Sequence, residues 1–165
     1  MSNDVEKKEA LRKKSLGELG ELFGIKALVD ASFERVVNLN DKKMNYPFAD
    51  LYAEKENKRY SISIKARNKY QKNHTLNSRY NLGNNAYKKV QAAEIEYGAE
   101  AHWMTIQFDV NTYSIYFGSL HELNQRNAIP VRECEQGAVG TCLVRYRRHY
   151  FDFEFFGNKK NFCAT

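Results

Sequence analysis

The sequence has few of the features that mark secreted, zinc-binding or membrane proteins. Its three cysteines, Cys134, Cys142 and Cys163, are odd in number and include no CxxC pair, which argues against a disulfide framework and a paired-cysteine zinc site. The N-terminus is charged, and no stretch reaches the roughly 18 to 20 apolar residues of a membrane helix. We therefore expect a soluble protein of the reducing cytoplasm.

Internal repeats, low-complexity linkers and breaks in composition are also absent from the sequence. A chain of 165 residues is long enough to bury a core without disulfides or a structural metal. The sequence predicts a single domain over residues 1–165, with its core at about 15–118 and a C-terminal extension of the same domain at 119–165.

Positive charge and aromatic side chains are abundant. Lys and Arg total 26 against 20 Asp and Glu, for a net charge of +6, and the aromatic residues include 11 Tyr and 10 Phe. A basic surface gains affinity for nucleic acid by neutralising phosphates, and aromatic rings stack on bases. Many basic proteins bind no nucleic acid, so this balance favours such a partner without identifying it.

The segment that organises the sequence is a predicted β-hairpin at residues 46–67, YPFADLYAEKENKRYSISIKAR. Aromatic and β-branched residues favour a strand on each side of a polar turn. A two-residue turn at 56–57 places Asp50 opposite Ser63 and diagonal to Lys65. In this register one face is polar and the other apolar, and a slip by one residue would mix the two. The hairpin therefore sets a carboxylate beside a lysine.

Periodicity predicts further elements on both sides of the hairpin. They are one long helix, or two in line, at 5–33, a strand at 34–39, a helix at 85–97, a hairpin with strands at 102–110 and 113–118, a short helix at 119–126, and at least one strand within 142–156. Gly17, Gly20 and Gly24 each cost roughly 1 kcal/mol in a helix interior, which suggests close packing of this helix on the sheet.

A polar stretch at residues 68–85 is too long for an ordinary connection. It carries Lys69, Lys72 and Arg79 interleaved with tyrosines, which suits contact with nucleic acid, although a solvated loop explains these residues about as well. Together with Arg67 at the end of the preceding strand, they are the candidate nucleic-acid-binding residues.

The order of these elements resembles that of the PD-(D/E)xK nuclease superfamily, over about residues 15–109. The segment FADLYAEKENKRYSISIKAR is similar to the part of the Holliday-junction-resolvase-like and restriction-endonuclease-like branches where an Asp-bearing strand turns into a strand ending in (D/E)xK. The preceding LGELGELFGIKAL is similar to their first core helix, which carries a glutamate.

The resemblance implies a restriction-endonuclease-like α/β core, with a mixed sheet of four or five strands flanked by helices. It implies a Mg²⁺-dependent endonuclease, with Mn²⁺ as an alternative ion, that hydrolyses DNA rather than RNA. Asp50 would bind the metal, Lys65 would be the catalytic lysine and Glu21 the helix glutamate, with Glu18 as the weaker match. Dimers are common in the superfamily, so a homodimer is a further expectation.

Ser63 departs from the pattern, because it stands where the family has Asp or Glu. A hydroxyl there removes a charge that a hard cation favours. A similar S-x-K occurs in a subset of type II restriction enzymes, in which a glutamate further along the chain supplies the missing ligand. Here Glu94, on the following helix, is the first candidate for that metal ligand and Glu21 is the second.

The proposed chemistry requires these residue types independently of the resemblance. A divalent ion held by Asp50 can stabilise both the phosphate and an attacking water, and Lys65 can orient or help deprotonate that water. Three alternatives stay open. In the first, Asp50 and Lys65 form an ordinary cross-strand ion pair. In the second, the fold is a decayed nuclease that acts as a nucleic-acid-binding or inhibitor module. In the third, the chain cleaves RNA.

Overall fold

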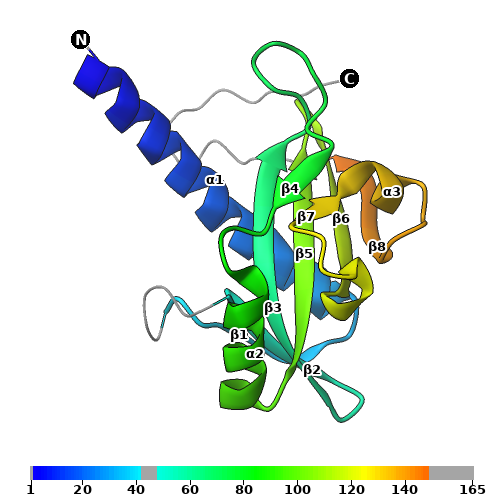
Figure 1. Cartoon of the computed structure of the whole chain (residues 1–165). Helices are drawn as coiled ribbons and strands as arrows, with labels where there is room; N and C mark the ends of the chain where they lie inside the picture. Colours follow the sequence, from blue (N-terminus) through cyan, green and yellow to red (C-terminus); the bar gives the residue numbers. More distant parts are fainter. Residues whose placement is uncertain (1, 42–47, 149–165) are drawn as a thin grey trace.

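Six strands form one curved sheet at the centre of the computed structural model, which describes residues 2–41 and 48–148 (Figure 1). The strand order is β1-β2-β3-β5-β6-β8, and β4 and β7 form a separate small sheet. The helical elements are α1 Ser2–Asp30, α2 Ala86–Tyr97, the 3₁₀ turn η1 His121–Leu123 and α3 Val131–Glu135. The strands are β1 Glu34–Asn38, β2 Leu51–Lys55, β3 Lys58–Asn68, β4 Arg79–Asn81, β5 Glu100–Phe108, β6 Thr112–Ser119, β7 Ala128–Pro130 and β8 Thr141–Arg148.

The central sheet is mixed. β3 and β5 are parallel and α2 makes the crossover between them, whereas every other neighbouring pair in this sheet is antiparallel. The expected mixed α/β sheet with flanking helices is thus confirmed, but the expected number of four or five strands is wrong. β8 pairs along β6 and adds a sixth strand, because its half-buried Leu143 and Val144 pack against the main core.

The predicted register of the β2–β3 hairpin is confirmed. Lys55 pairs with Lys58, and the ladder continues to Leu51 opposite Ile62. The two turn residues at 56–57 have φ angles of 50° and 63°, which are the positive values that a two-residue type I′ turn requires. β2 begins five residues later than the predicted strand, whose first two residues, 46–47, lie outside the described part.

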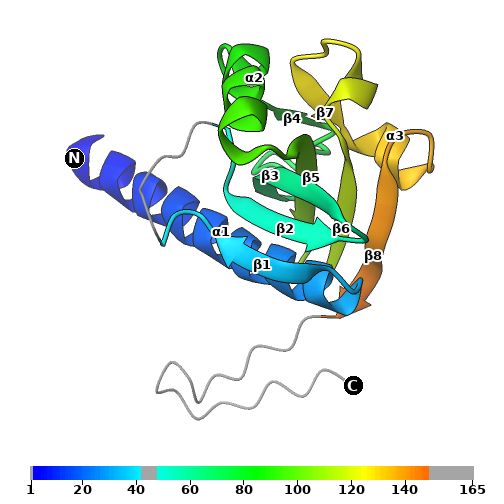
Figure 2. The same ribbon diagram turned by 90° about the horizontal axis from the view of Figure 1, so that it is seen from below.

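A single helix, α1, crosses one face of the sheet (Figure 2). Its C-terminal half lies close to β3. A Cβ atom at Gly20 would lie 2.5 Å from the Cβ of Ala66, and one at Gly24 would lie 2.9 Å from Cδ1 of Ile64. The close packing that the glycines suggested is therefore present at these two positions. A Cβ atom at Gly17 would have no neighbouring atom within 4 Å, so Gly17 is not needed for close packing.

The opposite face of the sheet is covered by α2, the β4–β7 pair and α3 (Figure 2). Trp103 of β5 is fully buried there, and its indole N–H donates to the carbonyl oxygen of Ser119. The β4–β7 pair and α3 were not expected from the sequence, because each strand has only three residues. They give the sheet a second core, distinct from the core under α1.

Differences from the sequence-based elements are concentrated in the last third of the chain. The predicted helix at 119–126 is only the 3₁₀ turn η1. The β5–β6 hairpin turns at residues 109–111, slightly earlier than predicted. The C-terminal stretch supplies β8, and its remainder from residue 149 lies outside the described residues. None of the described helices is both long and apolar enough to cross a membrane.

Candidate functional site

Asp50 lies immediately before β2, where that strand separates from β3. Its Oδ2 accepts a hydrogen bond of 2.6 Å from the backbone N–H of Ile64 and lies 3.5 Å from the hydroxyl of Ser63. Its own N–H donates to the carbonyl of Ile62. The side chain therefore lies beside Ser63, as the hairpin register predicted, and it satisfies a β3 N–H that β2 no longer reaches.

The electrostatic surroundings of Asp50 disfavour its ionised form. Burial raises its pKa, and the nearby carboxylate of Glu21 raises it further. The Ile64 N–H and the Lys65 ammonium lower it, without cancelling the effect of burial. A half-buried carboxylate is thus held close to a second carboxylate and a cation.

Lys65 is half-buried on β3 and is an electrostatic partner of Asp50. Burial lowers the pKa of Lys65, the charge of Asp50 opposes that shift, and the positive charges of Arg67 and Lys89 add to it. A lysine with a lowered pKa gives up its proton more readily than a solvated one. The predicted neighbours at positions 50 and 65 therefore interact in the folded chain.

Glu21 approaches the same place from α1. Its two carboxylate oxygens accept hydrogen bonds of 2.9 Å from the side-chain amides of Asn38 and Asn40. The backbone N–H of Asn40 in turn donates to the side-chain oxygen of Asn38. The amide of Asn40 also lowers the pKa of Asp50, so it lies between the two acids. Glu18, one turn earlier, is exposed and pairs with Lys14.

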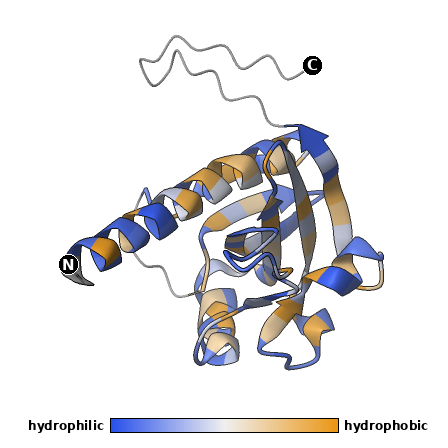
Figure 3. Ribbon diagram, turned by 90° about the horizontal axis from the view of Figure 1, so that it is seen from above, coloured by the Kyte–Doolittle hydropathy of each residue, from blue (hydrophilic) through white to orange (hydrophobic). Residues whose placement is uncertain are grey.

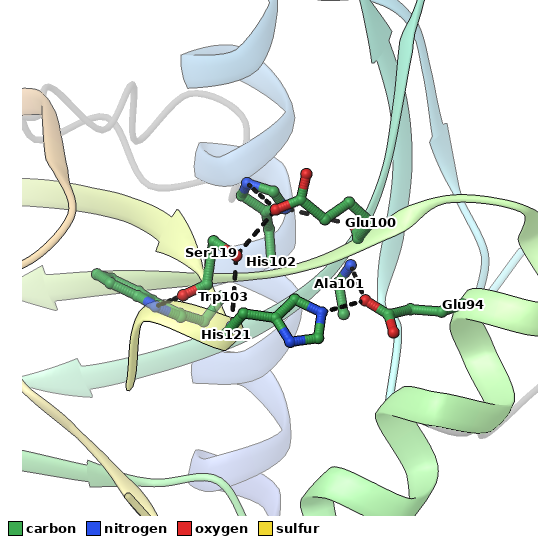
Figure 4. A network of polar contacts seen from close by, with 7 residues as sticks. All are labelled: Glu94, Glu100, Ala101, His102, Trp103, Ser119 and His121. Atoms are coloured by element: carbon green, nitrogen blue, oxygen red, sulfur yellow. Dashed lines mark hydrogen bonds and ion pairs between the residues drawn. The ribbon is translucent and has the colours of Figure 1, made fainter. Parts of the chain in front are cut away.

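Glu94 lies in a different network of polar contacts (Figure 4). Its Oε1 accepts a 3.0 Å hydrogen bond from the N–H of Ala101 and lies 2.8 Å from Nε2 of His121. Ala101 of β5 pairs with Ser61 of β3, and β3 separates β5 from the side of the sheet on which Asp50 lies beside Ser63. The structure therefore does not bring Glu94 together with Asp50.

The four candidate nucleic-acid-binding residues are distributed over two regions. Arg67 and Lys72 line one groove between α1 and the segment after β3. Lys69 is adjacent, with its ammonium 4.8 Å from the ring centre of Tyr146. Arg79 lies on β4 and lines a separate hollow beside β7.

The donor atoms around Asp50 suit a hard divalent cation. Asp50, Glu21 and Ser63 offer only oxygen ligands, and Mg²⁺ is typically bound by one or two protein carboxylates while it keeps several waters. The carboxylate of Glu21 raises the pKa of Asp50, which indicates a position where a cation would be favourable. Within residues 2–41 and 48–148, no group of three or more His, Cys, Asp or Glu side chains forms a ready metal cage.

Two site residues, Asn38 and Asn40, were missed by the sequence analysis, which assigned one to a strand and the other to a polar loop. The signal that could have found them is their i, i+2 spacing at the end of β1, which places both side chains on the same side. Their amides donate to both oxygens of the Glu21 carboxylate and so fix its position.

Comparisons with known proteins support the fold. No protein-family model matches the sequence, and no curated protein matches it. A similar solved structure is Hjc, a Holliday junction resolvase from the archaeal hyperthermophile Archaeoglobus fulgidus. The two structures superpose with a TM-score of 0.50 at 17% sequence identity, over 70% of this chain and 88% of the resolvase chain. The chain therefore has the restriction-endonuclease-like fold of that enzyme.

Proposed function

We propose that this protein is a divalent-metal-dependent endonuclease that hydrolyses phosphodiester bonds in DNA. The observation that carries the proposal is the convergence of Asp50, Lys65 and Glu21, from three different elements, on one half-buried position. The similar solved structure is that of a DNA-processing enzyme, which supports DNA over RNA as the substrate.

We also propose that the protein is a homodimer in the cytoplasm. Sedimentation analysis would test the dimer, and localisation of a tagged chain would test the compartment.

The residues have distinct roles in this proposal. Asp50 and Glu21 would hold Mg²⁺ or Mn²⁺, which when bound would stabilise negative charge on the scissile phosphate and on the attacking water. Lys65 orients that water and offsets charge that develops on the phosphate oxygens. Ser63 positions Asp50 through its hydroxyl. Asn38 and Asn40 keep Glu21 in place.

The second candidate function is a decayed nuclease that binds nucleic acid without cleaving it. Ser63 favours this reading, because the hydroxyl supplies no charge to the cation site. Under this reading Asp50 and Lys65 would remain close, and divalent ions would not bind.

Metal binding distinguishes the two functions and also identifies the second carboxylate. We expect Mg²⁺ and Mn²⁺ titrated into the parent protein to give a calorimetric signal that Asp50→Ala and Glu21→Gln abolish. Glu94→Gln, the matched control, should bind the ion like the parent, because Glu94 contacts His121 and Ala101 instead. Loss of binding in Glu94→Gln but not in Glu21→Gln would reverse the assignment of the second ligand.

Cleavage is tested on a panel of substrates. Duplex DNA, four-way-branched DNA, single-stranded DNA and RNA are incubated with either ion, and Lys65→Ala serves as the control for contaminating nucleases. We expect DNA cleavage that requires both the ion and Lys65. The endonuclease proposal would be rejected in favour of the binding module if no substrate is cut with either ion, and in favour of an RNA nuclease if only RNA is cut.

A further inference from the structure

A wide groove lies between the N-terminal half of α1 and the segment that follows β3. It has a volume of about 910 Å³. Arg12 and Lys13 of α1 line one wall, and Arg67 and Lys72 line the other. Four cations thus face a groove that is large enough for an extended chain segment.

One acid, Glu9, occupies this basic groove. Its Oε1 lies 2.8 Å from Nη2 of Arg12, and its Oε2 lies 3.3 Å from both Nε of Arg12 and Nζ of Lys72. Arg12 is one helical turn away, but Lys72 belongs to the opposite wall. The two cations hold the pKa of Glu9 down at about 2, so it is ionised at any ordinary pH.

The chemistry of this contact matches that of a nucleic-acid backbone. A carboxylate carries one negative charge on two terminal oxygens, and so does the phosphodiester group with its two non-bridging oxygens. Arginine binds either group through two parallel N–H bonds, and lysine adds a point charge. Glu9 therefore occupies the position at which Arg12 and Lys72 could both hold a backbone phosphate.

We propose that Glu9 is an internal substitute for a DNA phosphate, and that a DNA backbone displaces it when the substrate enters this groove. The choice of DNA rests on the proposed endonuclease function. Glu9 then acts as a negative regulator of binding, because each encounter with DNA must first break its contacts to Arg12 and Lys72. The N-terminal half of α1 becomes part of the substrate-binding surface.

Two residues link this groove with the surroundings of the candidate catalytic position. Arg67 follows Lys65 by two positions on β3, so both side chains point to the same face of the strand. Lys13 lines this groove and also the hollow of about 510 Å³ that contains Glu21. A backbone held by Arg12 and Lys72 can therefore extend toward Asp50 and Lys65.

The test compares Glu9→Gln with Glu6→Gln, which removes the same charge from an exposed position on the same half of α1. Fluorescence anisotropy with a labelled DNA duplex, without divalent ions, gives affinities over a series of salt concentrations. We expect Glu9→Gln to bind about three- to tenfold tighter at low salt and to steepen the slope of log K against log[salt] by about 0.9, equivalent to one more phosphate. Glu6→Gln should change the affinity less than about twofold.

A double-mutant cycle tests whether Lys72 is the cation that Glu9 occupies. Lys72→Ala should weaken binding more in the Glu9→Gln background than in the parent, because only there is Lys72 unoccupied before DNA arrives. Equal effects of Glu9→Gln and Glu6→Gln would reduce the result to net charge and overturn the inference. Weaker binding by Glu9→Gln would show that Glu9 stabilises the DNA-binding form of the groove by linking its two walls, which would overturn the inference. If neither the parent nor the variant binds DNA, the groove is not a DNA-binding site.

The groove assignment and the proposed endonuclease function can fail separately, and the experiments distinguish the two failures. Tighter DNA binding by Glu9→Gln without cleavage by the parent under any ion would leave the groove assignment standing and reject the endonuclease. Cleavage by a parent whose Glu9→Gln and Glu6→Gln variants bind alike would do the reverse. Because Glu9 is only half-buried, Glu6 is exposed, and both lie outside the two cores, both variants should retain the parent melting temperature.

Discussion

At the scale of single residues, the ionised side chain of Asp50 is unfavourable for the stability of the fold. Burial and the neighbouring carboxylate of Glu21 raise its pKa, and the contacts from Ile64 and Lys65 only partly compensate. A folded-state pKa above the unfolded value means that the ionised side chain lowers the free energy of unfolding at neutral pH. Under the proposed function, this charge is needed to bind a cation, and perturbed carboxylates of this kind are common at functional sites.

We predict that Asp50→Asn stabilises the metal-free protein by about 1 kcal/mol near neutral pH. The amide removes the buried charge but keeps an oxygen to accept the Ile64 N–H. The gain should shrink as the pH falls through the raised pKa of Asp50, because the parent side chain is then protonated and neutral. Urea denaturation at several pH values measures this. Asp50→Ala, which leaves the N–H without an acceptor, should instead destabilise, and a loss of stability in Asp50→Asn at neutral pH would contradict the electrostatic account.

At the scale of elements, the packing of α1 on β3 depends on glycine at one position and not at another. An alanine at Gly20 would place its Cβ 2.5 Å from the Cβ of Ala66, which is attached directly to the β3 backbone and cannot rotate away. An alanine at Gly17 would meet no atom within 4 Å. The two positions are one turn apart on the same helix, so they form a matched pair.

We predict opposite effects of the same substitution at these two glycines. Gly17→Ala should stabilise the protein by about 1 kcal/mol, because it removes the entropic penalty of glycine in a helix. Gly20→Ala should destabilise it by about 1–3 kcal/mol, because α1 must move away from β3. Thermal or urea unfolding measures both. Equal stabilisation by the two variants would show that α1 does not lie this close to β3.

The sequence specified some elements better than others, and local chemistry explains the difference. The β2–β3 register was predictable because strand alternation and a two-residue turn agree at every position from Leu51 to Ile62. The β4–β7 pair was not, because its two strands have three residues each and are separated by α2, β5 and β6. Short segments carry too little periodicity to predict a partner so distant in the sequence.

In the candidate site, too, the sequence predicts the local contacts but not the contacts between distant elements. Asp50 directly precedes β2 and Lys65 is on β3, and the sequence determines the register of these two strands. Which glutamate lies near Asp50 depends on how the helices pack against the sheet. Strand alternation carries no information on that packing, so the sequence could not show that Glu21 lies nearer than Glu94. The contact between Glu9 and Lys72 could not be predicted from the sequence, because an acid one turn from an arginine on an exposed helix is typical of an ordinary i, i+3 pair.

At the scale of the whole molecule, the proposed binding groove assigns stability and substrate contact to different halves of α1. Side chains of the C-terminal half, from Leu16 onward, pack on the core below the sheet, and Leu28 is fully buried there. The N-terminal half extends past the sheet and is largely hydrophilic (Figure 3). Its side chains from Asp4 to Ser15 are exposed, apart from the half-buried Glu9.

We predict that deletion of residues 2–13 leaves the fold intact and removes DNA affinity. The shortened helix would begin at Ser15, and Ser15 with Glu18 has the S-x-x-E spacing of a capping box, which satisfies the new N-terminal N–H groups. The melting temperature should stay within about 3 °C of the parent. Affinity for a DNA duplex should fall at least about tenfold at low salt, and the salt slope should decrease by about two, because Arg12 and Lys13 are lost.

The control for this deletion is Leu28→Ala in the C-terminal half of the same helix. It should lower the free energy of unfolding by about 2–4 kcal/mol, because it leaves a cavity in the core, while the folded variant binds DNA like the parent. Calorimetric melting and anisotropy titration measure both properties on each protein. A deletion variant that binds DNA with unchanged affinity would place the substrate outside the groove, and one that unfolds would show that the N-terminal half of α1 is a structural part of the fold.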